Sequence, residues 1–512
     1  MNRLPASLLL VALLSSAASA ATKSTTTARP GGSADSKSRL VAGTFASLPF
    51  RSIGPALTSG RIVDLAVAPD DKRTWYVASA YGGVWKTTNA GTTWTPIFDG
   101  QGTSSIGCVA VDPAHPLTVW VGTGENNSQR SVGWGDGLYR SDDAGRTWRN
   151  VGLKASEHIG QVAIDPRNSN VVFAAAQGPL WAPGGDRGLY KTADGGRTWK
   201  QVLKVDEWTG ANEVCFDPRN PDILYATTYQ RHRKVWTLID GGPGSGIWKS
   251  TDAGETWTKL SEGLPKDDLG RIGLATSRLE PNVVYAIVEA AGTGSGVYRS
   301  SDAGTSWEKM GDYTTTSPQY YQKLFADPRQ PGRLYAIDTY LQASDDHGRT
   351  WRHAGEKSKH VDNHVVWIDP DDSEHLLAGC DGGLYQTFDR CATWNYFSNL
   401  PVTQFYKLDV DNSAPFYYVY GGTQDNNSLG GPSRTMNAHG IRDSDWFITT
   451  GGDGFQRWLG ERGAGFICMS QYKNRFHYSA PIHSTSSAAI WSGVRSFTTL
   501  VSRCCLGRLA ET

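Results

Sequence analysis

A short motif recurs seven times in this chain, and no other feature restricts the fold as strongly. Five copies share one pattern: SDDAGRTW, TADGGRTW, STDAGETW, SSDAGTSW and SDDHGRTW. A softer copy, TTNAGTTW, precedes them and an altered copy, TFDRCATW, follows them. The tryptophans that end successive copies are 54, 51, 58, 50, 44 and 43 residues apart. Repeats of this length, with strand-like segments between them, predict the blades of a β-propeller.

Each unit contains four strand-like segments. Two apolar runs are joined by an Asp-Pro turn, as in VAIDPRNSNVVFAAA. A third strand (GLYKT) leads into the motif, and a fourth (WKQVL) follows it. The sequence therefore predicts an all-β propeller of four-stranded blades, with seven Asp-containing blades over residues 46–400. Residues 401–456 show two clear strands and no motif, which predicts a partial eighth unit that either closes the ring or begins a second propeller.

The residue types of the motif suit a tight turn that anchors a blade. A short Asp or Asn side chain accepts backbone N–H groups within the turn, and Gly tolerates positive φ. The terminal Trp begins the next strand, where it can bury a large apolar surface. We expect a structural role for Asn89, Asp143, Asp194, Asp252, Asp302, Asp346 and Asp389, and for Trp94, Trp148, Trp199, Trp257, Trp307, Trp351 and Trp394. Catalysis by these aspartates and calcium binding by the turns are the alternatives.

The overall charge argues against nucleic acid as a partner. Lys and Arg number 50, as do Asp and Glu, so no net positive field exists to attract phosphates. The spacing of Cys and His resembles no zinc site, and we expect neither a metal nor a cofactor. Cys108 and Cys215 lie in apolar strand-like runs, which favours buried free thiols over a disulfide framework. The oligomeric state stays open.

The first twenty residues have the features of a secretory signal. Arg3 precedes a short apolar core, and the small residues of ASA end at Ala20. Residues 21–45 are rich in Ser, Thr and Gly and predict a disordered lead-in. No later segment is long and apolar enough to span a membrane. We therefore expect a secreted or periplasmic protein after removal of residues 1–20.

The motif is the Asp-box, or bacterial neuraminidase repeat, and the chain resembles exported bacterial Asp-box propeller proteins of the sortilin type, a group often labelled glycosyl hydrolases. The resemblance covers about residues 46–456. It rests on FRSIGPALTSGRI, VGTGENN, QRHRKVWTLIDGGPGSGIWKSTDAGETW, DNHVVWIDP, DGGLY, GGTQDNN and GGDGF. It implies that the Asp-box turns lie on the outer rim and that ligands bind at the axial mouth. Family members are usually much longer.

Polar residues in the glycine-rich connections between strands are the candidates for ligand binding. They are Glu125, Tyr229, Arg231, His364, Asp381, Asp425 and Asp453. Each also has a plain structural interpretation: a turn or loop-capping residue, a solvated charge run from Arg231 to Lys234, or a structural pair of Asp362 and His364. Because equivalent connections emerge on one face of a propeller, we expect Glu125, Arg231, His364, Asp381 and Asp425 to share an axial face.

Three functions follow from these features. The leading hypothesis is an exported propeller that binds peptide or glycan at its axial face. The alternative is a glycoside hydrolase acting on β-glucan-type polysaccharide, which needs two carboxyl groups either about 5–5.5 Å or about 6.5–9.5 Å apart. Glu125, Asp381, Asp425 and Asp453 are the candidates, but xyloglucan-active relatives are expected to carry a catalytic Asp where this chain has Ala80. The third hypothesis is an envelope scaffold without a ligand.

Residues 457–512 differ in composition from everything before them. They contain no Asp, and hold six Arg and one Lys against two Glu. We interpret this atypical tail either as the product of a reading-frame shift near codon 456 or as a divergent terminal segment. Translating the downstream DNA in the other two frames separates the two hypotheses.

Overall fold

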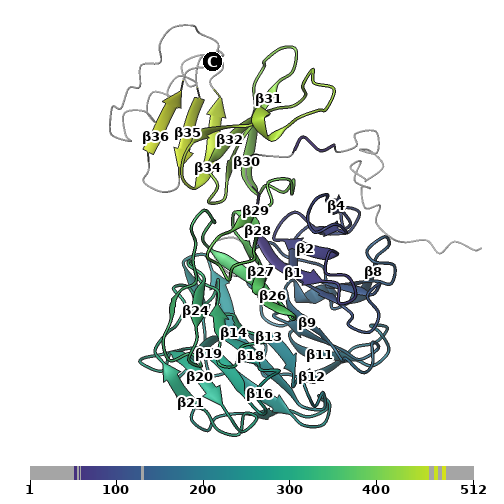
Figure 1. Ribbon diagram of the computed structural model, residues 1–512, viewed down its shortest axis with the longest axis vertical. Helices are drawn as coiled ribbons and strands as arrows, with labels where there is room; N and C mark the ends of the chain where they lie inside the picture. Colours follow the sequence, from purple (N-terminus) through teal and green to yellow (C-terminus); the bar gives the residue numbers. More distant parts are fainter. Residues whose placement is uncertain are drawn as a thin grey trace, which may run out of the picture. The chain divides into compact units, whose positions relative to one another are not determined.

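The computed structural model describes residues 51–54, 57, 59–127, 132–459, 466–470 and 475–479. The expected signal and lead-in, residues 1–45, lie outside this part of the chain, as does most of the tail. Within it, the regular structure is β-strand apart from two 3-10 helices, η2 (Lys154–Ser156) and η3 (Asp443–Asp445). In Figure 1 the strands are coloured along the sequence, from purple near the N-terminus to yellow near the C-terminus.

Seven consecutive antiparallel sheets, which we call blades 1 to 7, span residues 62–396. Blade 1 contains β1 (Ile62–Val67), β2 (Trp75–Ser79), β3 (Val84–Thr87) and β4 (Thr95–Pro96). Blade 2 contains β5 (Ile106–Val111), β6 (Val119–Thr123), β7 (Leu138–Ser141) and β8 (Arg149–Gly152). Blade 3 contains β9 (Ile159–Ile164), β10 (Val172–Ala176), β11 (Gly188–Thr192) and β12 (Lys200–Leu203).

Blade 4 has a fifth strand on a long hairpin. It contains β13 (Thr209–Phe216), β14 (Leu224–Lys234), β15 (Thr237–Asp240), β16 (Gly246–Ser250) and β17 (Thr258–Lys259). Blade 5 contains β18 (Leu269–Thr276), β19 (Val284–Ala290), β20 (Gly296–Ser300) and β21 (Glu308–Gly311). Blade 6 contains β22 (Leu324–Ala326), β23 (Leu334–Ala336), β24 (Gln342–Ser344) and β25 (Arg352–His353). Blade 7 contains β26 (Asn363–Asp369), β27 (Asp372–Cys380), β28 (Gly383–Thr387) and β29 (Asn395–Tyr396).

The apolar core is divided into clusters that lie between neighbouring blades. Each adjacent pair from blades 1 and 2 to blades 6 and 7 shares one cluster of buried side chains. A further cluster joins Ile62 and Leu65 of blade 1 to Val365 and Leu377 of blade 7. The last sheet therefore packs on the first, as in a β-propeller, and the eighth unit is not needed to close the ring.

The eighth unit is a complete sheet, which corrects the prediction of a partial one. It contains β30 (Phe405–Val410), β31 (Tyr418–Thr423), β32 (Ser428–Pro432) and β33 (Phe447–Thr450). A three-stranded sheet follows, of β34 (Gly454–Leu459), β35 (Phe466–Ser470) and β36 (Arg475–Ser479). We did not expect strands in the atypical tail, yet β34 also lies against β30 and β31.

The Asp-box turn joins the third strand of a blade to the fourth and is closed by its own side chains. In blade 2, Asp143 accepts the Thr147 backbone N–H at 2.8 Å and the Thr147 hydroxyl at 2.7 Å. Ser141 Oγ donates to the same carboxylate and accepts the Gly145 N–H, both at 2.8 Å. The Thr147 hydrogen bonds lower the pKa of Asp143 to about 2. Gly145 has φ of +87°, which a residue with a Cβ rarely adopts.

Asp143→Asn is expected to change stability little, whereas Asp143→Ala is expected to destabilise the protein clearly, as for the loss of a capping side chain. Blade 1 already carries Asn89 at this position, and its amide oxygen accepts the Thr93 N–H at 2.9 Å. Urea unfolding of both variants measures the difference. Equal losses in the two variants would show that the carboxylate charge, rather than the hydrogen bonds, supports the turn.

Candidate functional site

The connections that face the Asp-box turns from the other end of the strands form one surface, which we call the loop face. It consists of the loops from second to third strands and the connections from one blade to the next, because antiparallel strands alternate in direction. Glu125 and Asp381 lie in second-to-third-strand loops of blades 2 and 7. Arg61 and Tyr320 lie in connections that lead into blades 1 and 6. Residues from distant blades thereby reach one another.

Arg61 is the centre of a buried charge cluster. Its Nε donates to Asp381 Oδ1 at 2.6 Å, and its Nη1 makes an ion pair with Glu125. The three side chains are at most 3% exposed. Burial raises the pKa of Glu125, although the Arg61 charge opposes this. Burial alone would also raise the pKa of Asp381, but Arg61 and then His364 outweigh it and hold that pKa well below its ordinary value.

His364 is neutral and oriented by its two partners. The Asn127 amide nitrogen donates to the Tyr320 carbonyl at 2.8 Å, which fixes the amide's orientation. The same nitrogen lies 2.5 Å from His364 Nδ1, so Nδ1 is the acceptor and Nε2–H donates to Asp381 at 2.7 Å. Burial lowers the pKa of His364 to about 4. His364 therefore pairs with Asp381 and not with Asp362, which corrects that interpretation.

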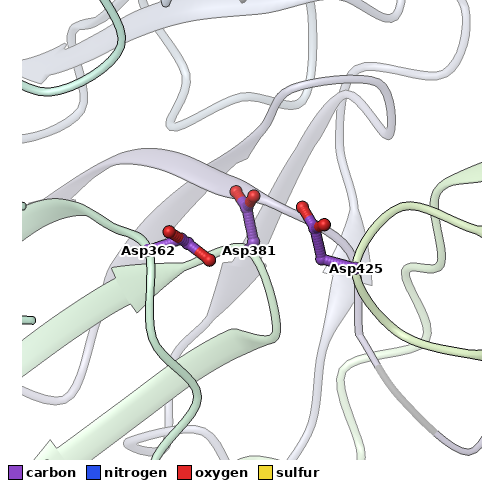
Figure 2. A group of neighbouring side chains, drawn as sticks. All are labelled: Asp362, Asp381 and Asp425. Carbon is purple, nitrogen blue, oxygen red and sulfur yellow. The ribbon is translucent and has the colours of Figure 1, made fainter. Parts of the chain in front are cut away.

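Asp381 lies between two further carboxyl groups, as Figure 2 shows for Asp362 and Asp425. One oxygen of each group lies within 4.8 Å of the others. Burial, followed by the charge of Asp381 and a hydrogen bond to it, raises the pKa of Asp425 to about 8. Burial and Asp381 also raise the pKa of Asp362. At neutral pH Asp425 is thus a carboxylic acid that donates to an ionised Asp381.

Three neighbouring carboxyl groups can also resemble a cation site, but the hydrogen bonds here favour another explanation. Asp381 Oδ1 already accepts from Arg61 and His364, and Oδ2 accepts the Tyr320 hydroxyl at 2.7 Å. The cluster therefore contains its own countercharge and its own proton donor. We interpret it as a pair of protonated Asp425 and ionised Asp381, held in place by the Arg61 guanidinium.

The remaining predicted residues lie around this cluster. Asp453 is buried and accepts the Asp425 backbone N–H at 3.0 Å, so it positions the Asp425 loop. Tyr229 and Arg231 are each 1% exposed, which excludes the solvated charge run for Arg231. The charge of Glu125 acts on Arg231 and slightly opposes the lowering of its pKa. Ala80 is fully buried and offers no group for acid–base chemistry.

Sequence reasoning did not single out three residues that complete the cluster. Arg61 had one signal, a lone charge directly before an apolar strand (SGRIVDLAV). Tyr320 had none, because its partner Asp381 lies in another blade. Tyr81 hydrogen-bonds Glu125, and burial followed by the Glu125 charge raises its pKa. Tyr81 is also 38% exposed, so it connects the buried cluster to the surface.

Exposed aromatic rings lie on the same kind of loop as the residues of this cluster. Second-to-third-strand loops carry Trp134 in blade 2, Trp181 in blade 3 and Tyr340 in blade 6, and Trp236 caps the β14–β15 hairpin of blade 4. Their exposures are 71%, 56%, 44% and 79%. Arg187 holds the Trp181 loop through the carbonyls of Gln177 and Ala182. Large exposed rings on rigid loops mark a binding surface.

A separate hollow of about 590 Å³ lies at the rim between blades 1 and 2. Its lining includes Lys86, Arg146 and Trp148, with Asp99 as the carboxyl group. One carboxyl group cannot supply an acid and a second carboxylate, so the loop face remains the candidate site.

The sequence also makes predictions about the state of the cysteines and the presence of membrane spans. Cys108 and Cys215 are free, as are Cys380 and Cys391. No described helix has the length and apolarity needed to cross a membrane.

A family model and several characterised proteins match parts of the chain. Residues 136–263 match the family model for Sortilin, neurotensin receptor 3. Xyloglucanase Xgh74A of Acetivibrio thermocellus is 28% identical over 254 residues, which cover 42% of this chain and 27% of that protein. A xyloglucanase of a Paenibacillus species is 24% identical over 367 residues, which cover 61% of this chain and 34% of that protein. The match thus spans about a third or less of each relative.

Solved structures support the same relationship at the level of the fold. The GH74 xyloglucanase of Xanthomonas campestris superposes with a TM-score of 0.55 at 16% identity, covering 84% of this chain and 73% of that one. The GH74 enzyme of Niastella koreensis gives a TM-score of 0.59 at 16% identity, with 86% and 68% covered. The chain is therefore an Asp-box propeller protein with a Sortilin-Vps10 segment and distant homology to the GH74 xyloglucanases.

Proposed function

We propose that this chain acts on a β-glucan of the xyloglucan type as a glycoside hydrolase, with Asp425 as the general acid. One observation carries the proposal: a carboxylic acid with a pKa of about 8 lies on the same face as a set of exposed aromatic rings. Aromatic rings stack on the apolar faces of sugars, and cleavage of a glycosidic bond needs a proton for the leaving oxygen. Homology to proteins named xyloglucanases supports this choice of substrate.

The three carboxyl groups would have different roles. Asp381 is buried and both of its carboxylate oxygens accept hydrogen bonds, so it stays ionised. Its negative charge keeps the proton on Asp425. Asp425 and Asp362 are both partly exposed, and they flank Asp381 (Figure 2). Asp362 is therefore the second carboxyl group of the pair. Oxygens within 4.8 Å of one another lie slightly closer than the separation of about 5–5.5 Å for the carboxyl pair of a retaining glycosidase.

Binding without hydrolysis is the second candidate function, and Ala80 favours it. A residue without acid–base chemistry stands where the resemblance implies a catalytic Asp. In this case the loop face would capture a glycan, or a peptide as the Sortilin match suggests, and release it unchanged. Either activity suits a protein exported to meet its ligand, and export is itself a proposal from the first twenty residues.

Asp425→Asn is expected to slow the release of reducing ends from xyloglucan by about 100-fold or more, because an amide cannot protonate the leaving oxygen. In the unmodified protein the rate is expected to fall as the pH rises through about 8, where Asp425 loses its proton. Initial rates across this pH range measure both effects.

Asp371→Asn is the matched control, because Asp371 is 75% exposed in the turn between β26 and β27, at the opposite end of the strands from the loop face. Its rate and pH profile should equal those of the unmodified protein. Saturable binding of xyloglucan oligosaccharides without any turnover would replace hydrolysis by the second candidate. Absence of both binding and turnover would contradict a β-glucan function altogether.

A further inference from the structure

Two arginines on the loop face are buried without the partners that buried charges require. Arg231 and Arg271 are each 1% exposed. Among the described residues, Nε, Nη1 and Nη2 of Arg231 find no acceptor, nor do Nε and Nη2 of Arg271. Arg271 Nη1 alone donates, to the Gln319 carbonyl at 3.0 Å. An unpaired buried charge costs several kcal/mol. This cost points to a function for the two arginine side chains.

Both side chains lie where several blades converge. Arg231 comes from β14 of blade 4, yet Arg187 of blade 3, Arg271 of blade 5 and Glu125 of blade 2 all act electrostatically on it. A side chain meets groups from four blades only if it points toward the propeller axis. Arg231 also lies over the Tyr229 ring, with its guanidinium carbon 5.8 Å from the ring centroid.

Neighbouring carboxyl groups act electrostatically on these two charges, but among the described residues none accepts a hydrogen bond from either guanidinium. Glu125 is already paired with Arg61. Glu289 accepts the backbone N–H of Arg271 through Oε2 at 2.9 Å. Burial, and then Glu289, raise the pKa of Asp240 well above its ordinary value, so its charge is diminished. Glu213 acts on Arg271 but accepts the Leu274 N–H at 2.8 Å rather than the guanidinium.

Two neutral groups at the same place also have buried polar atoms without a partner. His158 is 2% exposed and its Nδ1 has no partner among the described residues, nor has the hydroxyl of Tyr229. Burial, followed by the Arg231 charge, keeps the pKa of His158 well below its ordinary value. Burial, followed by the charges of Arg187 and Arg271, lowers the pKa of Arg231 to about 9, so Arg231 stays charged at neutral pH. The guanidinium nitrogens that find no acceptor are thus unsatisfied donors in this part of the loop face.

We propose that Arg231 and Arg271 form a carboxylate-binding subsite, and that the natural glycan therefore carries uronate units. A guanidinium binds a carboxylate through paired, charge-assisted hydrogen bonds, which two unsatisfied arginines can supply together. The choice of a glycan rests on the proposed function, since the subsite shares the loop face with the exposed rings and the Asp425 cluster. A uronate bound here would lie beside the carboxyl pair, with Glu125 between the two.

The test compares two forms of one ligand. Xyloglucan oligosaccharides, and the same oligosaccharides with galactose oxidised at C6 to the carboxylate, are titrated against the full chain by calorimetry. We expect the oxidised form to bind about tenfold more tightly or better, with an advantage that shrinks as salt is added. Arg231→Met should abolish the advantage, so that the two forms bind with equal affinity. Equal affinities for the two forms in the unmodified protein would overturn the proposal.

Folding controls keep the result interpretable. Because Arg231 is an unpaired buried charge, Arg231→Met should raise the midpoint of thermal unfolding, and a clear drop would show that Arg231 has a structural partner. Arg219→Met is the matched control, since Arg219 is exposed in the turn between β13 and β14, and it should retain the full advantage.

Two further probes separate this subsite from the proposed function. If free glucuronate binds and the neutral oligosaccharides do not, the β-glucan function fails while the uronate subsite stands. If a short peptide with a free terminal carboxylate binds more tightly than glucuronate, and its amidated form does not, the glycan assignment is overturned in favour of a peptide.

Discussion

Arg61→Met is expected to lower the free energy of unfolding by about 3–5 kcal/mol, as for other buried ion pairs that lose one partner. Arg61 is the group that bridges Glu125 and Asp381, which are fully buried or nearly so. Without it, two carboxylates from blades 2 and 7 would remain in a site from which water is excluded. Their mutual repulsion would add to the loss of solvation. Urea unfolding at neutral pH, read by tryptophan fluorescence, measures the change.

The comparison with a surface pair tests the physical reason. Arg73 is 74% exposed and pairs with Asp71 at 2.9 Å, so Arg73→Met should cost far less than Arg61→Met. Adding Glu125→Gln and Asp381→Asn to Arg61→Met should restore part of the free energy of unfolding that Arg61→Met loses. A loss from Arg61→Met no larger than that from Arg73→Met would contradict the central role of Arg61.

The pH dependence of the loss supplies a second check. In the unmodified protein, Arg61 and His364 depress the pKa of Asp381 despite its burial, so its contribution is present above the ordinary pKa and falls away in acid. In Arg61→Met, burial without a cation should raise the pKa values of Asp381 and Glu125. The variant should therefore recover part of its relative stability as the pH falls and these groups take up protons.

Trp148 is partly buried against the cluster between blades 1 and 2, so Trp148→Ala is expected to cost about 3 kcal/mol, the lower end for removal of a large packed side chain. The indole packs edge-on against Phe98, with ring centroids 5.2 Å apart and an interplanar angle of 78°. Its Nε1–H donates to the Ile97 carbonyl at 2.6 Å. Truncation would leave a cavity in the cluster between blades 1 and 2 and an unpaired carbonyl. Urea unfolding measures the loss, and ligand preference in the folded fraction should not change.

Trp236→Ala is the control for this prediction. Trp236 is 79% exposed at the tip of the β14–β15 hairpin, so its removal should change stability by less than about 0.5 kcal/mol. If it belongs to the glycan surface, the same variant should weaken the binding of oligosaccharides. Similar losses of stability in the two variants would contradict the packing of Trp148 between blades.

The sequence by itself determined the local features of this protein, because these depend on neighbours in the chain. The hydrogen bonds of the Asp-box need only the residues from Ser141 to Thr147, so the motif could be interpreted directly. Strand number per blade followed from alternating apolar runs and Asp-Pro turns. The eighth unit was underestimated because β32 (SLGGP) and β33 (FITT) are short, and β32 is rich in glycine.

The tertiary structure alone decided the candidate site. Arg61 and Asp381 are 320 residues apart, and Asn127 and His364 are 237 apart, so no local pattern connects them. Closure of the ring brings the loops of blades 1, 2 and 7 together at the axis. It thereby decides which carboxyl group is ionised, which holds a proton and which arginines lack a partner. Those properties arise from burial and from charges in other blades, and neither is a property of a residue's neighbours in the chain.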